Sequence, residues 1–426
     1  MSEGIPARAA AQAILSDVLR KHRPLDSALE QLGHLAPRDA GFARAIASET
    51  LRRLGQIEAL VRHFVPKSPP PHKAGPTLEI LYAGSCELLF LDVAPHAAVD
   101  AANRLAQADD KAVHFKSLIN AVLRRVSRDG PAVLAAQDAA RLNTPDWLWT
   151  RWRETYGEET AREIAMAHAT PAPIDLVLKD DAFAARLGGA PLVGNIVRLT
   201  ESSRIEELPG FADGQWWVQD VAASLPARLL GDVAGQTVID LCAAPGGKTM
   251  QLAALGADVI AVEREPDRLE RLAENLKRTG LAATLIQADA RDFRPDAPAQ
   301  FVLLDAPCTA TGTIRRHPDL PWLKSASDVT YCEQAAADLL SAAAEMVKPG
   351  GVLVFAVCSL EREEGIEQIE NFLRTHREFA REPVTEAEVF GQALWLSTEG
   401  DLRTLPFYLK EKGGMDGFFA ARLRRL

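Results

Sequence analysis

The 426-residue sequence predicts an α/β protein in three parts. We expect an all-α domain over residues 1–132, a small α+β unit over 140–225, and an α/β domain with a parallel sheet over 226–426. Apolar residues recur every three or four positions up to about residue 130, which is typical of amphipathic helices. Beyond residue 226, short β-branched runs alternate with such helices, which indicates a parallel sheet covered by helices on both faces.

The N-terminal part shows helical spacing in ARAAAQAILSDVLRK, FARAIASETLRRLGQIEALVRHFV and SLINAVLRRVSRDG. The proline-rich stretch PKSPPPHKAGP at 66–76 predicts a rigid loop, because proline cannot continue a helix. The pair Gly130-Pro131 is expected to end the last of these helices. In the middle unit, five of the seven tryptophans accompany strand-like runs such as PIDLVLK and NIVRLTE.

The C-terminal part carries five candidate strands in the runs TVIDLCA, ADVIAVE, ATLIQAD, FVLLDAP and VLVFAVC. Helical stretches such as EPDRLERLAENLKRTG and CEQAAADLLSAAAEMVKPGG separate them. The segments LRTLPFYL and DGFFAARL predict a closing hairpin at the edge of the sheet.

Composition excludes several classes of protein. Hydrophobic residues make up 47% of the chain and charged residues 25%, as in ordinary globular proteins. The apolar runs are too short to cross a membrane, and the N-terminus lacks a signal-peptide pattern, so we expect a soluble, cytoplasmic protein. The five cysteines show no zinc-ligand spacing, and no metal is expected.

Charge is unevenly distributed along the chain. The formal net charge is −10, with about +3 over residues 1–130 and about −13 over the remainder. Such a balance argues against indiscriminate nucleic-acid binding, which needs a broad basic surface. It still allows a local basic groove in the N-terminal part.

The first strand is followed by a glycine turn. In DLCAAPGGKT, Gly246 and Gly247 let the backbone approach a ligand, and the next helix start offers free N–H groups. A phosphate-binding loop would need glycine at position 242, which is Cys242. We therefore take Cys242, Ala243, Ala244, Pro245, Gly246, Gly247 and Lys248 as candidate cofactor-binding residues. The alternative is a tight strand-to-helix turn without a ligand.

Two acids follow the next two strands. Glu263 has the spacing of carboxylates that accept hydrogen bonds from ribose hydroxyls, and Asp289 is placed to receive an adenine amino group. Either one alone is more often a surface carboxylate. The ordered set predicts a nucleoside cofactor, and the absence of phosphate-binding motifs favours S-adenosylmethionine.

Cys308 and Cys358 follow the fourth and fifth strands, so both thiols are expected at one cleft. Each alone could be an inert buried cysteine. A pair suits methylation of pyrimidine carbon 5, which becomes nucleophilic only after a thiolate adds to carbon 6. A nearby cation such as Lys248 or Arg315 would favour the thiolate. Cys242 is interpreted as loop packing.

The motifs DLCAAPGGKT, DAPCTATG, RRHPD, AVCSL and DGFFAARL resemble those of the RNA cytosine-5 methyltransferases of the Nop/Sun type. This resemblance implies a Rossmann-like S-adenosylmethionine methyltransferase domain. It further implies that Cys358 is the nucleophile, that Cys308 assists product release, and that Asp305 lies by the methyl donor and the target base. Relatives usually have threonine where this chain has Val357. We expect activity to survive that change.

The N-terminal segments RDAGFARAIASETLRRLG, ELLFLDVAPHAAVDAANRLA and FKSLINAVLRRV resemble the NusB-type helical RNA-binding fold. Fusion of such a domain to this core implies a small-subunit (16S) ribosomal RNA substrate. Candidate RNA contacts are Arg315, Arg316 and His317, with Arg52, Arg53, Arg124 and Arg125 as either RNA contacts or solvated helix faces.

The sequence therefore predicts an S-adenosylmethionine-dependent RNA (cytosine-5)-methyltransferase that acts as a monomer on small-subunit ribosomal RNA. One alternative is the same reaction on transfer RNA. Another is a non-catalytic RNA-binding factor in ribosome assembly. A thiol-disulfide role is less favoured, because the cysteines are far apart in sequence and form no CxxC motif.

Overall fold

The computed structural model describes residues 4–67, 69–200 and 204–426. The chain forms two compact units. The helical unit comprises Met1–Pro171 and Ile314–Ser325, and the sheet unit comprises Ala172–Thr313 and Ala326–Leu426. This grouping differs from the three parts expected from the sequence, because helices within 139–168 fall with the N-terminal helices and the strands within 175–218 fall with the C-terminal sheet.

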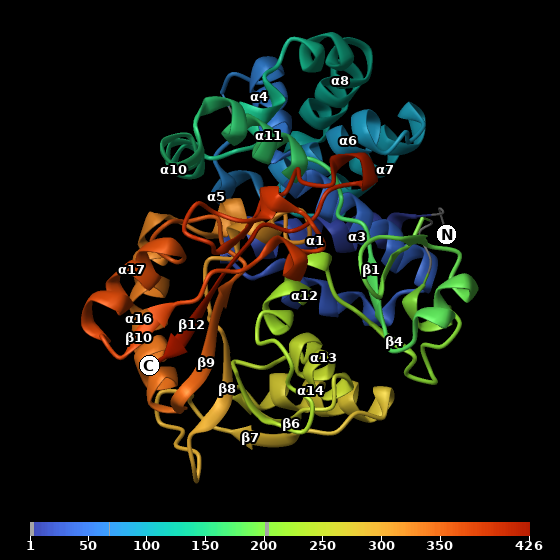
Figure 1. The fold of residues 1–426 in the computed structure, drawn as a ribbon. Coiled ribbons are helices and arrows are strands. Elements are labelled where there is room, and N and C mark those ends of the chain that lie inside the picture. Colours follow the sequence, from blue (N-terminus) through green and yellow to red (C-terminus); the bar gives the residue numbers. More distant parts are fainter. Residues whose placement is uncertain (1–3, 68, 201–203) are drawn as a thin grey trace. The chain divides into compact units, whose positions relative to one another are not determined.

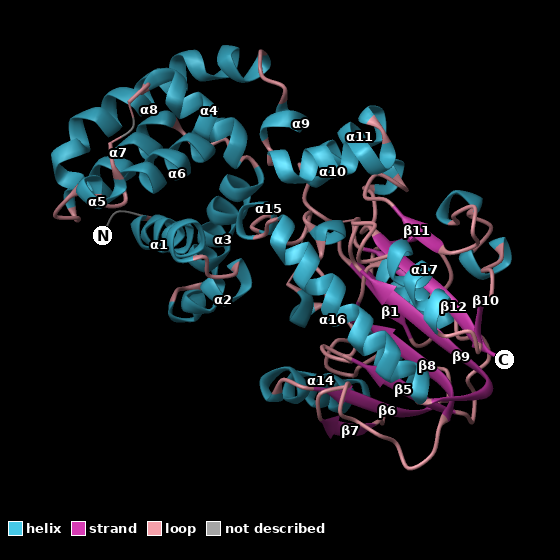
Figure 2. Ribbon diagram, turned by 90° about the vertical axis from the view of Figure 1, so that its left-hand side faces the viewer, coloured by secondary structure: helices cyan, strands magenta, loops and turns pink. Residues whose placement is uncertain are grey.

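The helical unit is built from amphipathic helices that bury alanine, leucine, isoleucine and valine against one another. None of the helices in the described ranges combines the length and the apolar character needed to span a bilayer. The helices of three or more turns are α1 (Ile5–Lys21), α3 (Pro37–Arg52), α4 (Leu54–Phe64), α6 (Thr77–Phe90), α7 (Pro95–Gln107), α8 (Lys116–Ala135), α10 (Asp146–Tyr156) and α11 (Glu158–His168) (Figure 2).

Two proline-based expectations need correction. Helix α8 does not end at Gly130-Pro131 but continues to Ala135. Gly130 is buried, and a β-carbon there would lie 3.3 Å from the Leu89 side chain, so close packing rather than a break accounts for this glycine. The proline-rich stretch at 66–76 is mainly loop but includes the one-turn helix α5 (Pro71–Ala74).

The segment Ile314–Ser325 belongs to the helical unit, although sheet-unit residues flank it on both sides. It carries the short helix α15 (Leu320–Leu323). The Asp319 carboxylate accepts a hydrogen bond from the Leu25 backbone N–H at 2.8 Å, and the Trp322 indole donates to the Leu51 carbonyl at 2.9 Å. These contacts make the segment part of the helical core.

The main sheet has the strand order β10-β12-β9-β8-β5-β6-β7, and β11 pairs with β12. Strands β9, β8, β5, β6 and β7 are parallel, as expected from the alternating pattern. The expected closing hairpin is present in the antiparallel pairing of β11 with β12, but β12 is not an edge strand, because β10 pairs with its other side. The strands are β5 (Thr237–Leu241), β6 (Asp258–Glu263), β7 (Thr284–Gln287), β8 (Ala299–Asp305), β9 (Val347–Val357), β10 (Phe379–Arg381), β11 (Leu402–Thr404) and β12 (Phe418–Arg425).

Helices cover both faces of this sheet (Figure 1). Side chains alternate along each strand, so Val238 packs on one face and Ile239 and Leu241 pack on the other. One face is covered by α12 (Val221–Arg228), α13 (Gly247–Ala254) and α14 (Pro266–Thr279), and the opposite face by α16 (Ala326–Glu345) and α17 (Ile366–Thr375).

A four-stranded antiparallel sheet precedes α12 and packs into the same core. Trp217 of this sheet is buried together with residues of α12. Arg198 forms a buried ion pair with Asp175 at 2.6 Å and donates to the Gly414 carbonyl at 2.6 Å, which joins the small sheet to the C-terminal segment. The strand order is β2-β3-β1-β4, with β1 (Asp175–Leu178), β2 (Ala190–Pro191), β3 (Ile196–Arg198) and β4 (Trp216–Val218).

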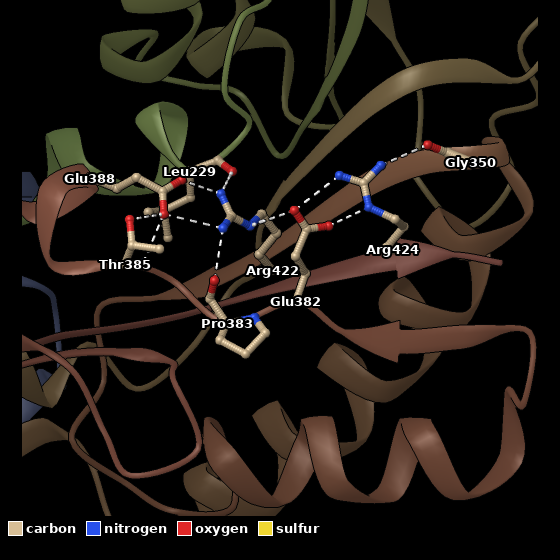
Figure 3. Close-up of polar contacts among 8 residues, drawn as sticks. All are labelled: Leu229, Gly350, Glu382, Pro383, Thr385, Glu388, Arg422 and Arg424. Carbon is tan, nitrogen blue, oxygen red and sulfur yellow. Dashed lines mark hydrogen bonds and ion pairs between the residues drawn. The ribbon is translucent and has the colours of Figure 1, made fainter.

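Strand β12 is held in place by the buried Arg422 (Figure 3). Its guanidinium donates to the Leu229 carbonyl at 3.1 Å and to the Pro383 carbonyl at 2.9 Å, and it pairs with Glu388. Its neighbour Arg424 is more exposed and donates to Glu382. Since β12 pairs along most of its length with β9, this network supports the strand that ends just before Cys358.

Candidate active site

A cavity of about 330 Å³ lies at the carboxyl ends of the parallel strands, within the size range of small-molecule sites. Its lining includes residues at the ends of β6 and β8 and residues in the loops that follow β5, β7 and β9. Open parallel sheets bind ligands at this edge, because the strand ends and the following loops meet there. Of the candidate residues from the sequence, the wall includes Cys242, Ala244, Glu263, Asp289, Asp305, Cys308 and Cys358.

The glycine turn after β5 borders this cavity through Cys242 and Ala244. Gly246 has φ of 104°, and a β-carbon there would lie 2.3 Å from a Leu272 methyl group, so only glycine fits. The turn is fixed to β6 by the Ala243 N–H, which donates to the Val262 carbonyl at 3.1 Å. Ala243, Pro245, Gly246 and Gly247 form the turn, whereas Cys242 and Ala244 reach the cavity wall.

Glu263 is 3% exposed, yet it borders the cavity. The backbone N–H groups of Ala244 and Glu265 donate to its two carboxylate oxygens at 3.3 and 3.0 Å. Arg268 lies 3.7 Å from the same carboxylate and donates to the Ala244 carbonyl. The carboxylate is thus rigidly held and keeps lone pairs that can accept hydrogen bonds from a diol.

Asp289 follows β7 on the same wall. The guanidinium of Arg291 donates to both of its oxygens at 2.9 and 2.6 Å, and these hydrogen bonds lower the pKa of Asp289 to about 2. Asp289 therefore stays ionised at neutral pH and can accept from an amino group. The rigid glycine turn and the two fixed carboxylates fit the nucleoside part of S-adenosylmethionine.

Lys248 and Asp305 form an ion pair beside the cavity. The Lys248 Nζ lies 2.7 Å from an Asp305 oxygen, and only 10% of the lysine side chain is exposed. Burial works to lower the pKa of Lys248, but the charge of Asp305 and its hydrogen bond outweigh it and raise the pKa. Lys248 is therefore cationic, and it lies close to Cys358.

The two thiols that follow β8 and β9 face each other. The Sγ atoms of Cys308 and Cys358 are 3.6 Å apart. The pKa of Cys308 is raised well above its ordinary value, mainly by the hydrogen bond with Cys358 and next by burial. The third thiol, Cys242, stays neutral as well, because burial raises its pKa to about 12. Val357, which replaces the usual threonine, is buried in the apolar core beneath them.

Sequence reasoning missed part of the wall. Tyr331 and Cys332 of α16 border the cavity, and Tyr331 is 76% exposed. The sequence feature that could have indicated this wall is the four-residue spacing of Tyr331, Ala335 and Leu339, which places all three on one helix face. Nothing in a single sequence shows that this face lines the cavity.

The proposed RNA contacts lie in the helical unit. Arg315 is only 2% exposed, so the prediction that it contacts an RNA backbone is wrong. Arg52 is also buried, pairs with Glu49 and donates to the Arg315 carbonyl at 2.9 Å, so it is not a solvated arginine. Arg316 and His317 are partly exposed, and their contact with RNA stays a prediction.

Two family models match the chain. Residues 227–424 match the model described as 16S rRNA methyltransferase RsmB/F, and residues 5–128 match the NusB family. The chain is 33% identical to ribosomal RNA small subunit methyltransferase B from Pasteurella multocida, across 99% of this chain and 96% of the relative. It is 34% identical to the protein of the same name from Klebsiella pneumoniae, across 99% of both chains.

Solved structures show the same fold. A methyltransferase homologue from Pyrococcus horikoshii is 28% identical, with a TM-score of 0.54 over 65% of this chain and 94% of its own. The structure of NSun6 from Pyrococcus horikoshii with SFG has a TM-score of 0.55 at 20% identity, over 66% of this chain and 98% of its own. At 20% identity, the similarity to NSun6 shows a shared fold and nothing more.

Proposed function

The chain belongs to the ribosomal RNA small subunit methyltransferase B family, and on that premise we propose that it methylates carbon 5 of one cytosine in small-subunit (16S) ribosomal RNA. It is an S-adenosylmethionine-dependent methyltransferase. The observation that carries the proposal is the pair of thiols 3.6 Å apart, in the same cavity as the two cofactor carboxylates.

Two thiols in such a cavity suit carbon methylation of a pyrimidine. The Cys358 thiolate adds to carbon 6, which pushes an electron pair toward carbon 5. Bound S-adenosylmethionine supplies the methyl group that carbon 5 takes up. A base then removes the carbon 5 proton, and the electron pair of that C–H bond restores the 5,6 double bond as the sulfur leaves. Cys308 assists the release of the methylated product.

The surroundings of the two thiols support this division of roles. The cationic Lys248 lies close to Cys358, and a nearby cation is a common neighbour of reactive cysteines. Asp305 holds the Lys248 ammonium in place. The hydrogen bond with Cys358 and burial raise the pKa of Cys308, which disfavours its thiolate and makes it a poor nucleophile.

The target cytosine has to leave its stack before a thiol can reach carbon 6. The exposed Arg124 and Arg125 on α8 and the partly exposed Arg316 and His317 are candidate contacts for the RNA backbone. A ribosomal RNA substrate would place the enzyme in the cytoplasm. We expect it to act as a monomer.

Cysteine variants of the full-length enzyme test the proposal. Cys358→Ala should abolish methylation of small-subunit ribosomal RNA while cofactor affinity is retained. Cys308→Ala should accumulate an RNA–protein adduct that survives a denaturing gel. Cys86→Ala is the matched control, because Cys86 is buried in the helical unit, where burial raises its pKa to about 12.

Each outcome separates the alternatives. Full turnover by Cys358→Ala would overturn the covalent mechanism. Methylation of transfer RNA alone, with the same cysteine dependence, would keep the reaction and replace the substrate. No methylation by the wild-type protein of either RNA would favour a non-catalytic assembly factor.

A further inference from the structure

A fully buried carboxylate lies behind the two cysteines. Glu364, in the loop between β9 and α17, has no exposed surface. Among the residues that the structure describes, no lysine or arginine forms an ion pair with it, and burial raises its pKa. A buried carboxylate without a cation is costly unless hydrogen bonds stabilise it, so its partners indicate what it does.

The partners of Glu364 are the residues that directly follow the two cysteines. The Thr309 backbone N–H donates to one of its oxygens at 2.8 Å, and the Thr309 hydroxyl donates to the other at 2.6 Å. The Ser359 hydroxyl donates to that second oxygen as well. One carboxylate thus fixes the residue after Cys308 and the residue after Cys358.

Neighbouring contacts show that this junction has a defined geometry. The Ser359 hydroxyl accepts from the Glu361 N–H at 3.0 Å, which leaves its own proton directed at Glu364. The Gly312 N–H donates to the Cys358 carbonyl at 3.0 Å, so the first cysteine loop also contacts the second directly. A β-carbon at Gly312 would lie 2.0 Å from the Gly417 carbonyl oxygen, which leaves no room for this loop to shift toward Gly417.

We propose that Glu364 is a positioning residue for the methyl transfer, because its buried carboxylate holds the two cysteine loops at the separation that lets both sulfurs face one base. This inference rests on the proposed function. Glu364 is too deeply buried to contact RNA or cofactor, so it acts only through Thr309 and Ser359. Its negative charge adds to the effects that keep Cys308 a neutral thiol.

The spacing of the two sulfurs can be measured without RNA. Diamide oxidises two adjacent thiols to a disulfide and takes up the two electrons and two protons itself. Peptide mapping by mass spectrometry then gives the rate at which Cys308 and Cys358 become linked in the full-length protein. We expect rapid linkage in the wild type, because the sulfurs are 3.6 Å apart.

Three variants should separate positioning from folding. Glu364→Ala should slow the linkage and lower kcat by about 100-fold, since a misplacement of about 1 Å has that effect, while cofactor affinity and the RNA KM stay near wild type. Glu364→Gln should keep most of the linkage rate and most of kcat. Its amide oxygen can accept from the Thr309 N–H, and its amide nitrogen can donate to the two hydroxyls. Glu370→Gln, on the exposed side of α17, is the control and should change nothing.

A folded Glu364→Ala protein that links its cysteines as fast as the wild type would overturn the proposal. Equal losses in Glu364→Gln and Glu364→Ala would also overturn it, since the amide variant keeps the geometry. If Glu364→Ala fails to fold, the double variant Thr309→Val, Ser359→Ala removes the hydroxyl donors and should slow the linkage. Failure of the wild type to methylate RNA would refute the proposed function, but would leave the linkage rates as a separate result.

Discussion

Cys308 and Cys358 have different charged neighbours although their sulfurs are only 3.6 Å apart. Lys248 interacts with Cys358, and its charge is secured by the 2.7 Å contact with Asp305. The hydrogen bond with Cys358 and burial raise the pKa of Cys308, and the charge of Glu364 raises it further. These neighbours are consistent with the different roles proposed for the two chemically identical side chains, which a motif alone cannot distinguish.

Asp240 gives a pH-dependent prediction at the same scale. It is fully buried at the end of β5, accepts a hydrogen bond from the Thr249 hydroxyl at 2.6 Å, and burial raises its pKa from 3.8 to about 7. The folded protein therefore holds this proton between about pH 4 and pH 7, where the unfolded chain releases it. The stability that this proton provides is complete below about pH 4 and is lost as the pH rises through 7.

Asp240→Asn keeps the shape and stays neutral at every pH. We expect its free energy of unfolding to fall less than that of the wild type between pH 5 and pH 8, so that the variant gains relative stability at pH 8. Urea denaturation at the two pH values measures this difference. If the free energy of unfolding changes equally in the two proteins between pH 5 and pH 8, Asp240 is already ionised across this range and the prediction is wrong.

At the scale of elements, the site depends on β8 and β9 lying side by side. These parallel strands pair up to Asp305 and Ala356, so the loops that carry the two cysteines start from neighbouring positions. Strand β12 pairs with the other side of β9, up to Phe419 opposite Val357. Loss of β12 would therefore free the strand end that presents Cys358.

Arg422→Leu tests how firmly β12 is held. The variant leaves Glu388 and the carbonyls of Leu229 and Pro383 without their buried donor, and breaking such a pair typically destabilises a protein by about 3–5 kcal/mol. Arg424→Leu is the control, because its side chain is 43% exposed and exposed pairs contribute about 0–1 kcal/mol. Urea denaturation of both should show the larger loss at Arg422, and equal losses would contradict the role of the network.

At the scale of the whole molecule, the chain passes from the sheet unit into the helical unit and back between β8 and α16. Sheet-unit residues that precede and follow this segment reach the cavity wall, with Ala310 before it and Tyr331 after it. The segment Ile314–Ser325 is held within the helical unit by hydrogen bonds of Asp319 and Trp322. The chain thus crosses between the two units at three points along the sequence, after Pro171, Thr313 and Ser325.

Much of this architecture could be predicted from the sequence. The β-branched runs mark β5 to β9, because buried parallel strands leave a strong apolar signal, and the residues after them proved to share one cavity. The excursion at 314–325 could not be foreseen, because local pattern does not tell which core a short segment joins. The burial of Arg315 and the continuation of α8 through Pro131 were missed for the same reason, since tertiary packing outweighs local preference.

The most direct test of the proposed function is bisulfite sequencing of total RNA from cells with and without the gene for this protein. Bisulfite leaves 5-methylcytosine unconverted, so each modified position appears as a retained cytosine. We predict that one retained cytosine in small-subunit ribosomal RNA disappears when the gene is deleted. An unchanged pattern in that RNA would contradict the proposed function.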